Sequence, residues 1–553
     1  MTDPLRSYKA AQGPIPPQIK RWHLTGAGFD ALHEVTVPLP RHGPDELLVR
    51  HDAVGICFSD IKIIAQGPAH PKLYGRDMEM QPVVMGHEVA LTVVGVGENL
   101  RDMFAVGQRF LVQADIYRHG VCIPYGYVLP GGMAQYGVVT QEALNGDHGC
   151  YLLPLADTTG FAEAALVEPW ACVVAAYRYP NYRPGPKPGG RLLVVNTRGV
   201  ETGDWGGVSV RDVAGTDFAR LRAEHTGDAG FDDVIVFGTP SPADLGRILT
   251  TLGSRGILNL VLDRPLVGPV PVDVGRVHYE QHLFVSATDP ARVLDAYQTN
   301  TRQDLKPGGA AWLVGAGGPM GQMHLERLAM LDAPPRLVLV TDSHDERLER
   351  IQERFEKRLA ARGITLVALN RRATDEIAAQ GPFDDIISMA SSAESITEAL
   401  PYLSEGGVYN LFAGLAKGTI TQLGLGTMLT KNQRMVGTSG STMDDIRQTL
   451  GLVESGRLST NSSVAAIGGL SAYQDGLLGV KNKRFPGKTV IFPQIEDLPL
   501  TSLEELSDRL PNVHARLRDG LFWTREAEEE LLREKAPQPP ILGEPERGRR
   551  VNS

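Results

Sequence analysis

Residues 306–321 read KPGGAAWLVGAGGPMG: a glycine turn, an apolar strand and a glycine-rich loop in direct succession. The loop has the spacing Gly-x-Gly-x-x-x-Gly and opens a helix. Glycines there let the backbone approach a pyrophosphate, whose charge is stabilised at the helix N-terminus. The next apolar run, residues 337–342, predicts a second strand that ends in an acid. The stretch therefore predicts the start of a Rossmann-like nucleotide-binding domain.

Seven residues of this stretch are expected to contact the dinucleotide: Gly315, Gly317, Gly318, Pro319, Met320, Gly321 and Asp342. Asp342 is placed to accept hydrogen bonds from the adenosine ribose hydroxyls. This favours NAD over NADP, because a carboxylate repels a 2′-phosphate. A simpler interpretation makes Asp342 a solvated turn residue, or the N-cap of a helix that begins near Ser343.

An earlier part of the chain repeats the pattern. Three pairs of segments match: 187–195 with 306–314, 231–235 with 383–387, and 256–260 with 407–411. The copies are 119 residues apart at the first match and 152 at the second, so the first copy is shorter by about one βα unit. Its loop, residues 196–200 (NTRGV), lacks the glycine pattern. We predict a degenerate repeat that binds no dinucleotide in the usual way and serves as scaffold, oligomer contact or wall of the substrate cleft.

The first 180 residues contain many short β-rich runs separated by glycine turns, a pattern typical of a barrel-like domain. Within them, Cys57, His87 and Glu88 offer a thiolate, an imidazole and a carboxylate. This donor set suits Zn²⁺. Taken alone, a single Cys is more often a small buried hydrophobe, and a single His more often a satisfied polar group.

Five motifs in order resemble the zinc-dependent medium-chain dehydrogenase/reductase (alcohol dehydrogenase) family. They are Gly-Ile-Cys-x-Ser-Asp at 55–60, Gly-His-Glu at 86–88, Val-Gly-Gln-Arg at 106–109, Gly-Gly-Met-Ala-Gln-Tyr at 131–136 and Glu-Pro-x-Ala-Cys-Val at 168–173. The branch that includes sorbitol dehydrogenase and sorbose-1-phosphate reductase is the most similar. The resemblance implies an α/β fold: a β-rich GroES-like catalytic domain plus a doubly wound Rossmann cofactor domain, here with an additional Rossmann-like insert.

Five segments are expected on this basis. They are the first part of the GroES-like catalytic domain (1–185), the degenerate repeat (186–304), the NAD-binding Rossmann domain (305–455), the return segment of the catalytic domain (456–495) and a C-terminal extension (496–553). In the extension we predict helices over 502–518 and 524–535 and a disordered tail from 536. The charged helix over 524–535 is expected to be solvated rather than to pack on a neighbouring subunit.

By the resemblance, Cys57, His87 and Glu88 match catalytic zinc positions. Glu168 matches a nearby acidic position that ligates the metal or holds its water; a plain helix-start carboxylate is the simpler interpretation. Ser59 matches the position that hydrogen-bonds the substrate oxygen and begins a proton relay, although it also suits a helix N-cap.

Two departures from the family pattern matter. Many relatives hold a second, structural zinc with four closely spaced Cys, whereas residues 115–131 offer only Cys122. We therefore predict at most one zinc per chain. The family position that often carries the outer His of the proton relay is Lys62, which leaves that member of the relay unassigned.

The resemblance implies a zinc-dependent oxidoreductase that transfers a hydride between a secondary alcohol (a polyol, sugar or sugar phosphate) and NAD, with NADP less expected. The cleft is expected between the catalytic and cofactor domains. Near it, residues 70–77 (HPKLYGRD) could hold a phosphate or polyol, or form a charged surface loop. Two alternatives are a lyase or epimerase that retains NAD, and a non-catalytic scaffold derived from a dehydrogenase.

Composition and charge limit the classes of molecule that the chain is expected to bind. The 553 residues carry a net charge of −10 without a basic run in the folded part, which argues against nucleic acid or an anionic membrane. No run of 18 apolar residues and no signal-peptide pattern occur, so no membrane span is expected and the cytoplasm is the default. Four scattered Cys give no disulfide framework. The resemblance further implies that the protein forms a homo-oligomer, a dimer or tetramer, and that its substrate is a small molecule.

Overall fold

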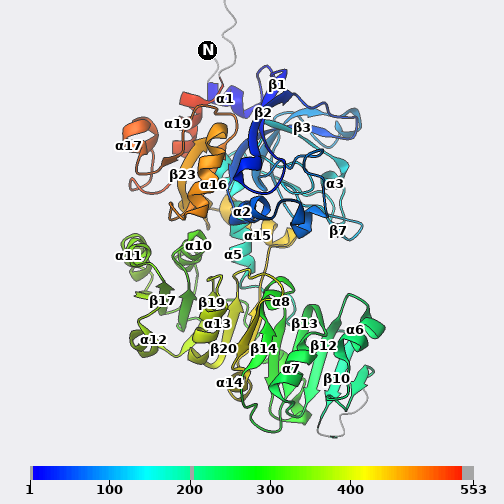
Figure 1. Cartoon of the computed structure of the whole chain (residues 1–553). Coiled ribbons are helices and arrows are strands. Elements are labelled where there is room, and N and C mark those ends of the chain that lie inside the picture. Colours follow the sequence, from blue (N-terminus) through cyan, green and yellow to red (C-terminus); the bar gives the residue numbers. More distant parts are fainter. Residues whose placement is uncertain (1–3, 198, 200–204, 300, 538–553) are drawn as a thin grey trace, which may run out of the picture. The chain divides into compact units, whose positions relative to one another are not determined.

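The computed structural model describes residues 4–537 except 198, 200–204 and 300. The chain forms two compact units. Unit 1 comprises Met1–Trp170 and Ile446–Ser553, and unit 2 comprises Ala171–Asp445 (Figure 1). Each unit combines sheets with helices, so the predicted α/β class is confirmed. Within the described residues, no helix combines the length and apolar character that a membrane crossing requires.

Unit 1 is built on an eight-stranded sheet of order β25-β23-β24-β3-β4-β5-β9, with β8 also paired to β3. Its strands are β3 (Leu47–Gly55), β4 (Glu88–Val96), β5 (Arg109–Val112), β8 (Tyr136–Val139), β9 (Leu152–Pro154), β23 (Val464–Gly469), β24 (Lys488–Phe492) and β25 (Thr501–Ser502). All nine residues of β3 are buried, because strands flank it and helices cover it. β24 pairs antiparallel with β3, so a segment from late in the chain completes the N-terminal sheet.

The remaining elements of this part are the paired strands β1 (Gln18–Leu24) with β2 (Leu32–Pro38) and β6 (Tyr117–Arg118) with β7 (Val121–Cys122), and the helices α1 (Pro4–Lys9), α2 (Phe58–Gln66), α3 (Gln141–Leu144), α4 (Phe161–Ala165), α5 (Val167–Ala175), α15 (Met443–Glu454), α16 (Tyr473–Lys481), α17 (Leu506–Arg509), α18 (Pro511–His514) and α19 (Arg525–Lys535). Helices α5 and α15 each cross a boundary between the units.

The C-terminal extension differs from the prediction in two ways. Residues 502–518 do not form one helix: two short helices follow β25, and Pro511 starts the second. Proline lacks the N–H that a continuous helix needs at that point. Helix α19 is present as predicted but is not solvated, because one face buries Ala527, Glu528, Leu531 and Leu532.

Glu528 explains how α19 is held. Its carboxylate accepts the backbone N–H groups of Phe161 and Ala162 at 2.6 and 2.7 Å, and so caps the N-terminus of α4. Burial raises the pKa of Glu528 to about 7. An ion pair of 2.7 Å between Lys9 and Glu529 joins α19 to α1, and Figure 1 shows these two helices side by side. The predicted tail lies outside the described residues from 538 onward.

Unit 2 contains one eleven-stranded sheet of order β11-β10-β12-β13-β15-β22-β20-β19-β16-β17-β18. The strands of the first repeat are β10 (Leu192–Asn196), β11 (Val208–Val210), β12 (Phe231–Phe237), β13 (Leu252–Val261) and β15 (Leu283–Ala287). Those of the second are β16 (Ala310–Val314), β17 (Leu337–Asp342), β18 (Thr365–Asn370), β19 (Phe383–Ser388), β20 (Leu403–Leu411) and β22 (Arg434–Gly437). We call these the first half and the second half.

The second half has the 3-2-1-4-5-6 strand order of a dinucleotide-binding Rossmann fold. The first half has the same order without the third strand, because β11 is followed by a helix and then by β12. The missing βα unit predicted from the repeat offset is therefore confirmed. Of the degenerate loop 196–200, residues 198 and 200 lie outside the described residues.

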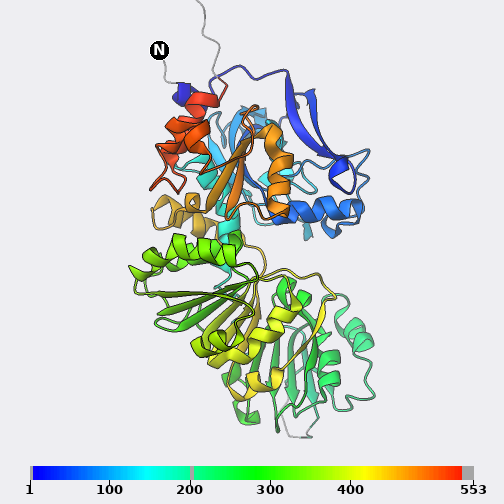
Figure 2. The same cartoon turned by 60° about the vertical axis from the view of Figure 1, so that its left-hand side comes forward.

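Helices lie on both sides of this sheet (Figure 2). They are α6 (Phe218–Thr226), α7 (Pro242–Leu249), α8 (Val274–Tyr279) and α9 (Asp295–Gln298) in the first half, and α10 (Pro319–Leu328), α11 (Asp345–Ala360), α12 (Thr374–Gln380), α13 (Ala393–Ala399) and α14 (Leu425–Thr430) in the second.

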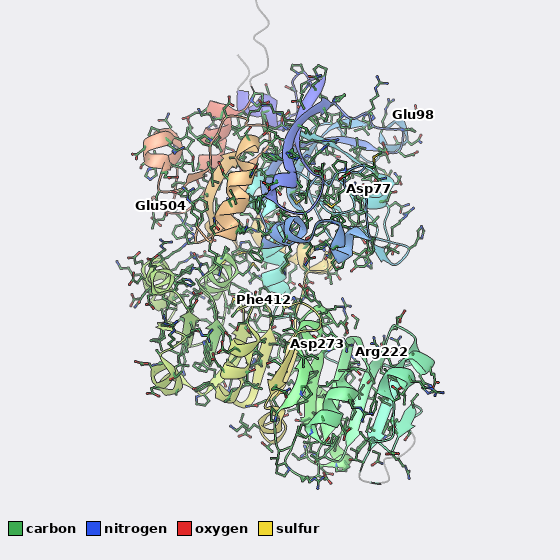
Figure 3. The ribbon with its side chains drawn as sticks, in the orientation of Figure 1. Asp77, Glu98, Arg222, Asp273, Phe412 and Glu504 are labelled. Atoms are coloured by element: carbon green, nitrogen blue, oxygen red, sulfur yellow. The ribbon has the colours of Figure 1, made fainter. Side chains whose placement is uncertain are left out.

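The two halves join edge to edge. β15 and β22 pair antiparallel, although the other paired strands of this sheet are parallel. A second antiparallel pair connects β14 (Val270–Asp273) of the first half to β21 (Ile420–Leu423) of the second. Asp273, labelled in Figure 3, accepts the N–H of Arg276 in its own half and that of Gly418 in the other. The halves thus share one sheet, which the sequence did not predict.

Candidate functional site

The predicted metal ligands lie at the ends of two paired strands in unit 1. Gly55, the last residue of β3, pairs with Glu88, the first residue of β4. Cys57 follows β3 as the N-cap of α2, and His87 directly precedes β4. The register of β3 and β4 therefore brings the thiol and the imidazole together.

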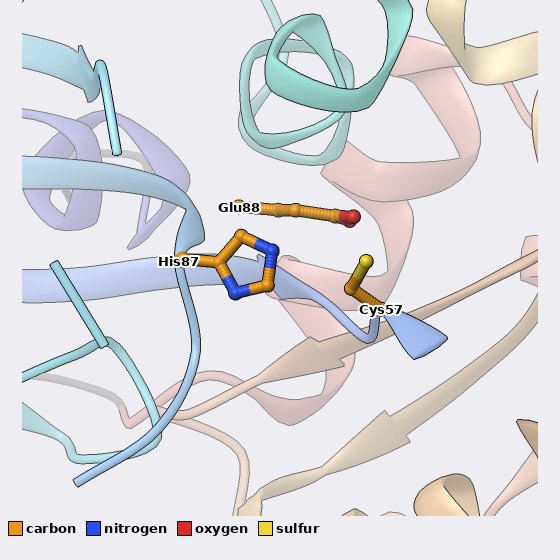
Figure 4. Close-up of side chains that lie close together, drawn as sticks. All are labelled: Cys57, His87 and Glu88. Carbon is orange, nitrogen blue, oxygen red and sulfur yellow. The ribbon is translucent and has the colours of Figure 1, made fainter. Parts of the chain in front are cut away.

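Cys57, His87 and Glu88 converge (Figure 4). One ligand atom from each, a sulfur, a ring nitrogen and a carboxylate oxygen, lie within 4.8 Å of one another. Within the described part of the chain, this is the group of three such donors near enough to share a metal ion. His87 is 6% exposed and Glu88 is fully buried, so a charge held here is shielded from water.

Asp60 orients two of these groups. It is fully buried, and its Oδ2 accepts the backbone N–H of Cys57 at 3.0 Å. Its Oδ1 lies 3.4 Å from His87 Nδ1. Burial lowers the pKa of His87, but Asp60, Tyr127 and Cys57 together raise it above its usual value. Ser59 Oγ lies 3.4 Å from the other ring nitrogen, Nε2. The sequence signal for Asp60 was its place three residues after an N-cap.

Glu88 is paired with a distant lysine. Lys488 Nζ donates to Glu88 Oε1 at 2.6 Å and to the carbonyl of Ile56 at 2.8 Å. Burial lowers the pKa of Lys488, but Glu88, Cys57 and Glu168 together raise it above its usual value. Glu88 Oε2 faces Gly55, where an added Cβ would lie 2.0 Å from it. No local pattern could have revealed Lys488, because it comes from β24.

Glu168 lies near the start of α5, half-buried. Burial raises its pKa to about 7; the charge of His87 opposes this shift and that of Glu88 adds to it. The charges of His87 and Glu88 therefore both act on the Glu168 carboxyl. The helix is anchored by Trp170, whose Nε1 donates to Ser463 Oγ at 3.1 Å.

Five buried polar atoms around the cluster have no hydrogen-bond partner among the described residues: Asp60 Oδ1, His87 Nδ1, Glu88 Oε2, Tyr473 Oη and Thr489 Oγ1. Buried polar atoms are almost always bonded to protein, water or an ion. Together with the sulfur, nitrogen and oxygen donors, they fit a site that binds a metal ion and ordered water.

The predicted substrate loop 70–77 uses its cations internally. Lys72 forms an ion pair of 2.7 Å with Asp115. Arg76 donates to backbone carbonyls at 2.7 to 3.2 Å, those of Gln81, Pro82, Tyr127 and Val128. These contacts favour a structural role for both cations. The Tyr127 ring lies 5.7 Å from the His87 ring and 5.6 Å from that of His70, so it lines the metal cluster without having been predicted.

The predicted dinucleotide loop lies in the second half of unit 2. Gly315 has φ of 75° and Gly318 is the N-cap of α10, with Pro319 as its first residue and Met320 and Gly321 following. A Cβ on Gly317 would lie 2.4 Å from Asp342, and one on Gly321 would lie 2.1 Å from the carbonyl oxygen of Ala316. Both positions thus require glycine, and no side chain caps α10.

Asp342 ends β17, as predicted, and is 7% exposed. Its Oδ2 accepts the N–H of Gly317 at 3.0 Å, and its Oδ1 accepts that of His344 at 3.1 Å. It is not a helix N-cap, because α11 begins at Asp345 with His344 as its N-cap. The carboxylate therefore holds the glycine loop and remains at the strand end where a ribose is expected.

Residues 43–145 match the family model of the alcohol dehydrogenase GroES-like domain. The chain is 24% identical over 516 residues to mannitol-1-phosphate 5-dehydrogenase of Aliivibrio fischeri, which covers 90% of this chain and 94% of the relative. It is 23% identical over 509 residues to L-sorbose 1-phosphate reductase of Klebsiella pneumoniae, with 90% and 93% covered. The structure of 2R,3R-butanediol dehydrogenase from Bacillus subtilis superposes with a TM-score of 0.52 at 17% identity, over 86% of this chain and 99% of that one. The chain belongs to the medium-chain dehydrogenase/reductase family.

This medium-chain dehydrogenase/reductase is an oxidoreductase of the alcohol and polyol dehydrogenase type. Four of the five motifs that carried the resemblance lie within the matched residues 43–145. The matches to the two sugar-phosphate enzymes cover 90% of the chain, so they include most of both halves of unit 2. The predicted family and fold class are confirmed.

Proposed function

We propose that the chain is a zinc-dependent dehydrogenase that oxidises a secondary alcohol of a polyol, sugar or sugar phosphate, or reduces the matching ketone, with NAD as coenzyme. The observation that carries this proposal is the convergence of Cys57, His87 and Glu88 within 4.8 Å, next to the Ser59 hydroxyl. When bound, Zn²⁺ would supply Lewis-acid polarisation of the substrate oxygen, and NAD would supply the hydride acceptor.

The chain's own residues then have distinct tasks. Cys57 and His87 hold the metal, with Asp60 keeping the imidazole turned so that Nδ1 faces the carboxylate and Nε2 faces Ser59. Glu88 and Glu168 are the carboxylates that can complete the ligand set; Lys488 balances the charge of Glu88. The Ser59 hydroxyl would take the proton from the substrate hydroxyl and release its own to solvent water.

The substrate class rests on the relatives, whose names state mannitol 1-phosphate and L-sorbose 1-phosphate as substrates. The preference for NAD rests on Asp342. Its buried carboxylate lies at the end of β17 beside the glycine loop, where it would bond ribose hydroxyls and repel a 2′-phosphate.

The test combines metal analysis with NADH formation over a panel of polyols and sugar phosphates. We expect about one zinc per chain, and NADH from at least one panel member. Cys57→Ser should lose both the zinc and turnover. Cys150→Ser is the matched control, because among the described residues Cys150 bonds only the carbonyl of Leu152.

Three outcomes would contradict this function. Turnover by metal-free protein would refute the zinc mechanism. Product without NADH, from protein purified with NAD bound, would indicate the lyase or epimerase alternative. Protein inert across the panel would indicate a scaffold.

A further inference from the structure

Tyr473 is a buried residue of unit 1 that the mechanism above does not use. It is the first residue of α16, its side chain has no exposed surface, and its ring packs edge-on against Trp22 at 5.8 Å. Its hydroxyl has no hydrogen-bond partner among the described residues. An unsatisfied buried hydroxyl destabilises the folded protein, so a bound partner is expected.

The surroundings of the hydroxyl indicate that partner. Helix α16 packs closely on the start of α2: a Cβ on Gly476 would lie 2.4 Å from Ile56. Burial raises the pKa of Tyr473 well above 10, and the charge that adds most to the shift is Asp60. Asp60 Oδ1 is itself a buried acceptor without a hydrogen bond among the described residues. Asp60 lies on α2 and Tyr473 on α16, two helices that pack together, so an unsatisfied buried donor and an unsatisfied buried acceptor lie on neighbouring elements.

We propose that Tyr473 is a positioning residue of the metal site: its hydroxyl donates through one bound water to Oδ1 of Asp60, and so holds this carboxylate against His87. Buried waters typically bond about three otherwise unsatisfied polar groups. The free Thr489 Oγ1 belongs to the same set of buried unpaired atoms and suits a third contact.

This contact would set the tautomer and orientation of His87, a proposed metal ligand. With Oδ1 of Asp60 fixed, Nδ1 of His87 carries the proton and donates to it, and Nε2 keeps its lone pair for the metal. Outer partners of this kind set the tautomer and orientation of a ligating His, and their loss typically costs about 10- to 100-fold in metal affinity. The proposal rests on the proposed zinc site, but it assigns a role to a residue outside the predicted ligands.

The test measures zinc affinity by competition with a chelator, using the full-length protein. Tyr473→Phe removes only the hydroxyl and should weaken zinc binding about tenfold, without lowering the melting temperature of the metal-free protein. Asp60→Asn should weaken binding by more. In the double variant, the tyrosine change should add little, because Tyr473 acts through Asp60. Tyr409→Phe is the matched control: it removes a buried hydroxyl in unit 2, bonded to the carbonyl of Ile396, and should leave zinc affinity unchanged.

Three results would overturn the proposal: zinc affinity of Tyr473→Phe within about twofold of the wild type, a full effect of Tyr473→Phe in the Asp60→Asn background, or an equal loss in Tyr409→Phe. If the wild type bound no zinc, the proposed function would fail first. A high-resolution crystal structure of the metal-free protein then decides the Tyr473 contact by itself. A water bonded to Tyr473 Oη and Asp60 Oδ1 supports it, and its absence refutes it.

Discussion

The two halves of unit 2 carry the same scaffold but different loops. In the first half, Asp233 accepts the N–H of Lys187 at 2.9 Å and pairs with Arg183 at 2.8 Å. In the second half, Asp385 accepts the N–H of Lys306 at 2.9 Å and pairs with Arg302 at 2.6 Å. The contacts that hold the central strands together have thus been kept in both copies.

The nucleotide-binding features differ. Val195 pairs with Val210 in the first half as Val314 pairs with Thr341 in the second, and the next residue is Arg211 in one half and Asp342 in the other. The first half therefore has a cation where the second has Asp342, the acid that we propose binds the ribose, and it lacks the glycine pattern. The comparison teaches that two copies can differ at the expected ligand loop while both keep the contacts between their central strands.

The largest effect is expected from breaking the shared scaffold. Asp385→Ala should destabilise unit 2 by about 3 kcal/mol, because it leaves a mostly buried arginine and a backbone N–H unpaired. Asp233→Ala should cost a similar amount. Urea unfolding followed by circular dichroism measures both. A first half that served no structural purpose would tolerate Asp233→Ala with little loss, and that outcome would contradict the shared scaffold.

The second-largest effect is expected from replacing Asp342, the acid at the end of β17. Asp342→Arg copies the first half into the second and should lower NAD affinity about 100-fold, since about two charge-assisted hydrogen bonds of roughly 1.5 kcal/mol each are lost. Arg211→Asp, the reciprocal change, should leave NAD affinity within about twofold. Titration of NAD fluorescence quenching measures both variants. A loss of affinity in Arg211→Asp alone would reverse the assignment of the two halves.

Substitutions where the two halves of unit 2 pack together should have a smaller effect on stability, and a similar one from either half. A Cβ on Gly275 would lie 2.2 Å from the carbonyl oxygen of Ala416, and one on Gly426 would lie 2.3 Å from that of Leu266. Each half thus packs a helix against the other's loop. Gly275→Ala and Gly426→Ala should each lower stability by about 1–3 kcal/mol through overpacking, seen as a lower melting temperature. Gly451→Ala is a control, because nothing lies within 4 Å of its Cβ.

The smallest effect is expected at the outer ion pairs. Lys187 bonds Asp232 and Lys306 bonds Asp384, both at 2.7 Å, and the two lysines are 55% and 54% exposed. Lys187→Ala and Lys306→Ala should each cost less than about 1 kcal/mol, because exposed pairs are screened by solvent. The difference from wild type should shrink further in about 1 M salt; a loss that persists in high salt would mean these pairs contribute by packing.

Much of the site could be predicted because it is local in sequence. The glycine loop, the acid at the end of β17 and Cys57 each lie where one strand meets one helix, and the residue types alone indicate their chemistry. The N-cap of α2 is Cys57 and not Ser59, so the interpretation of Ser59 as an N-cap was wrong. Lys488 and Tyr473 could not be predicted, since they reach the cluster from elements more than 380 residues away in the chain. The prediction that α19 is solvated was wrong for a related reason. The helix is mostly charged in sequence, yet three apolar residues and Glu528 lie together on one buried face.

By itself, the sequence determined the family, the α/β class, the existence of a repeat and the donor types at Cys57, His87 and Glu88. These depend on short spacings and on side-chain chemistry, which are readable in order. The edge-to-edge pairing of β15 and β22, and the grouping of Asp60 and Lys488 around the ligands, are visible only in the folded structure. Sheet edges and buried polar atoms are satisfied by whichever distant groups the fold brings near, and linear periodicity does not specify those partners.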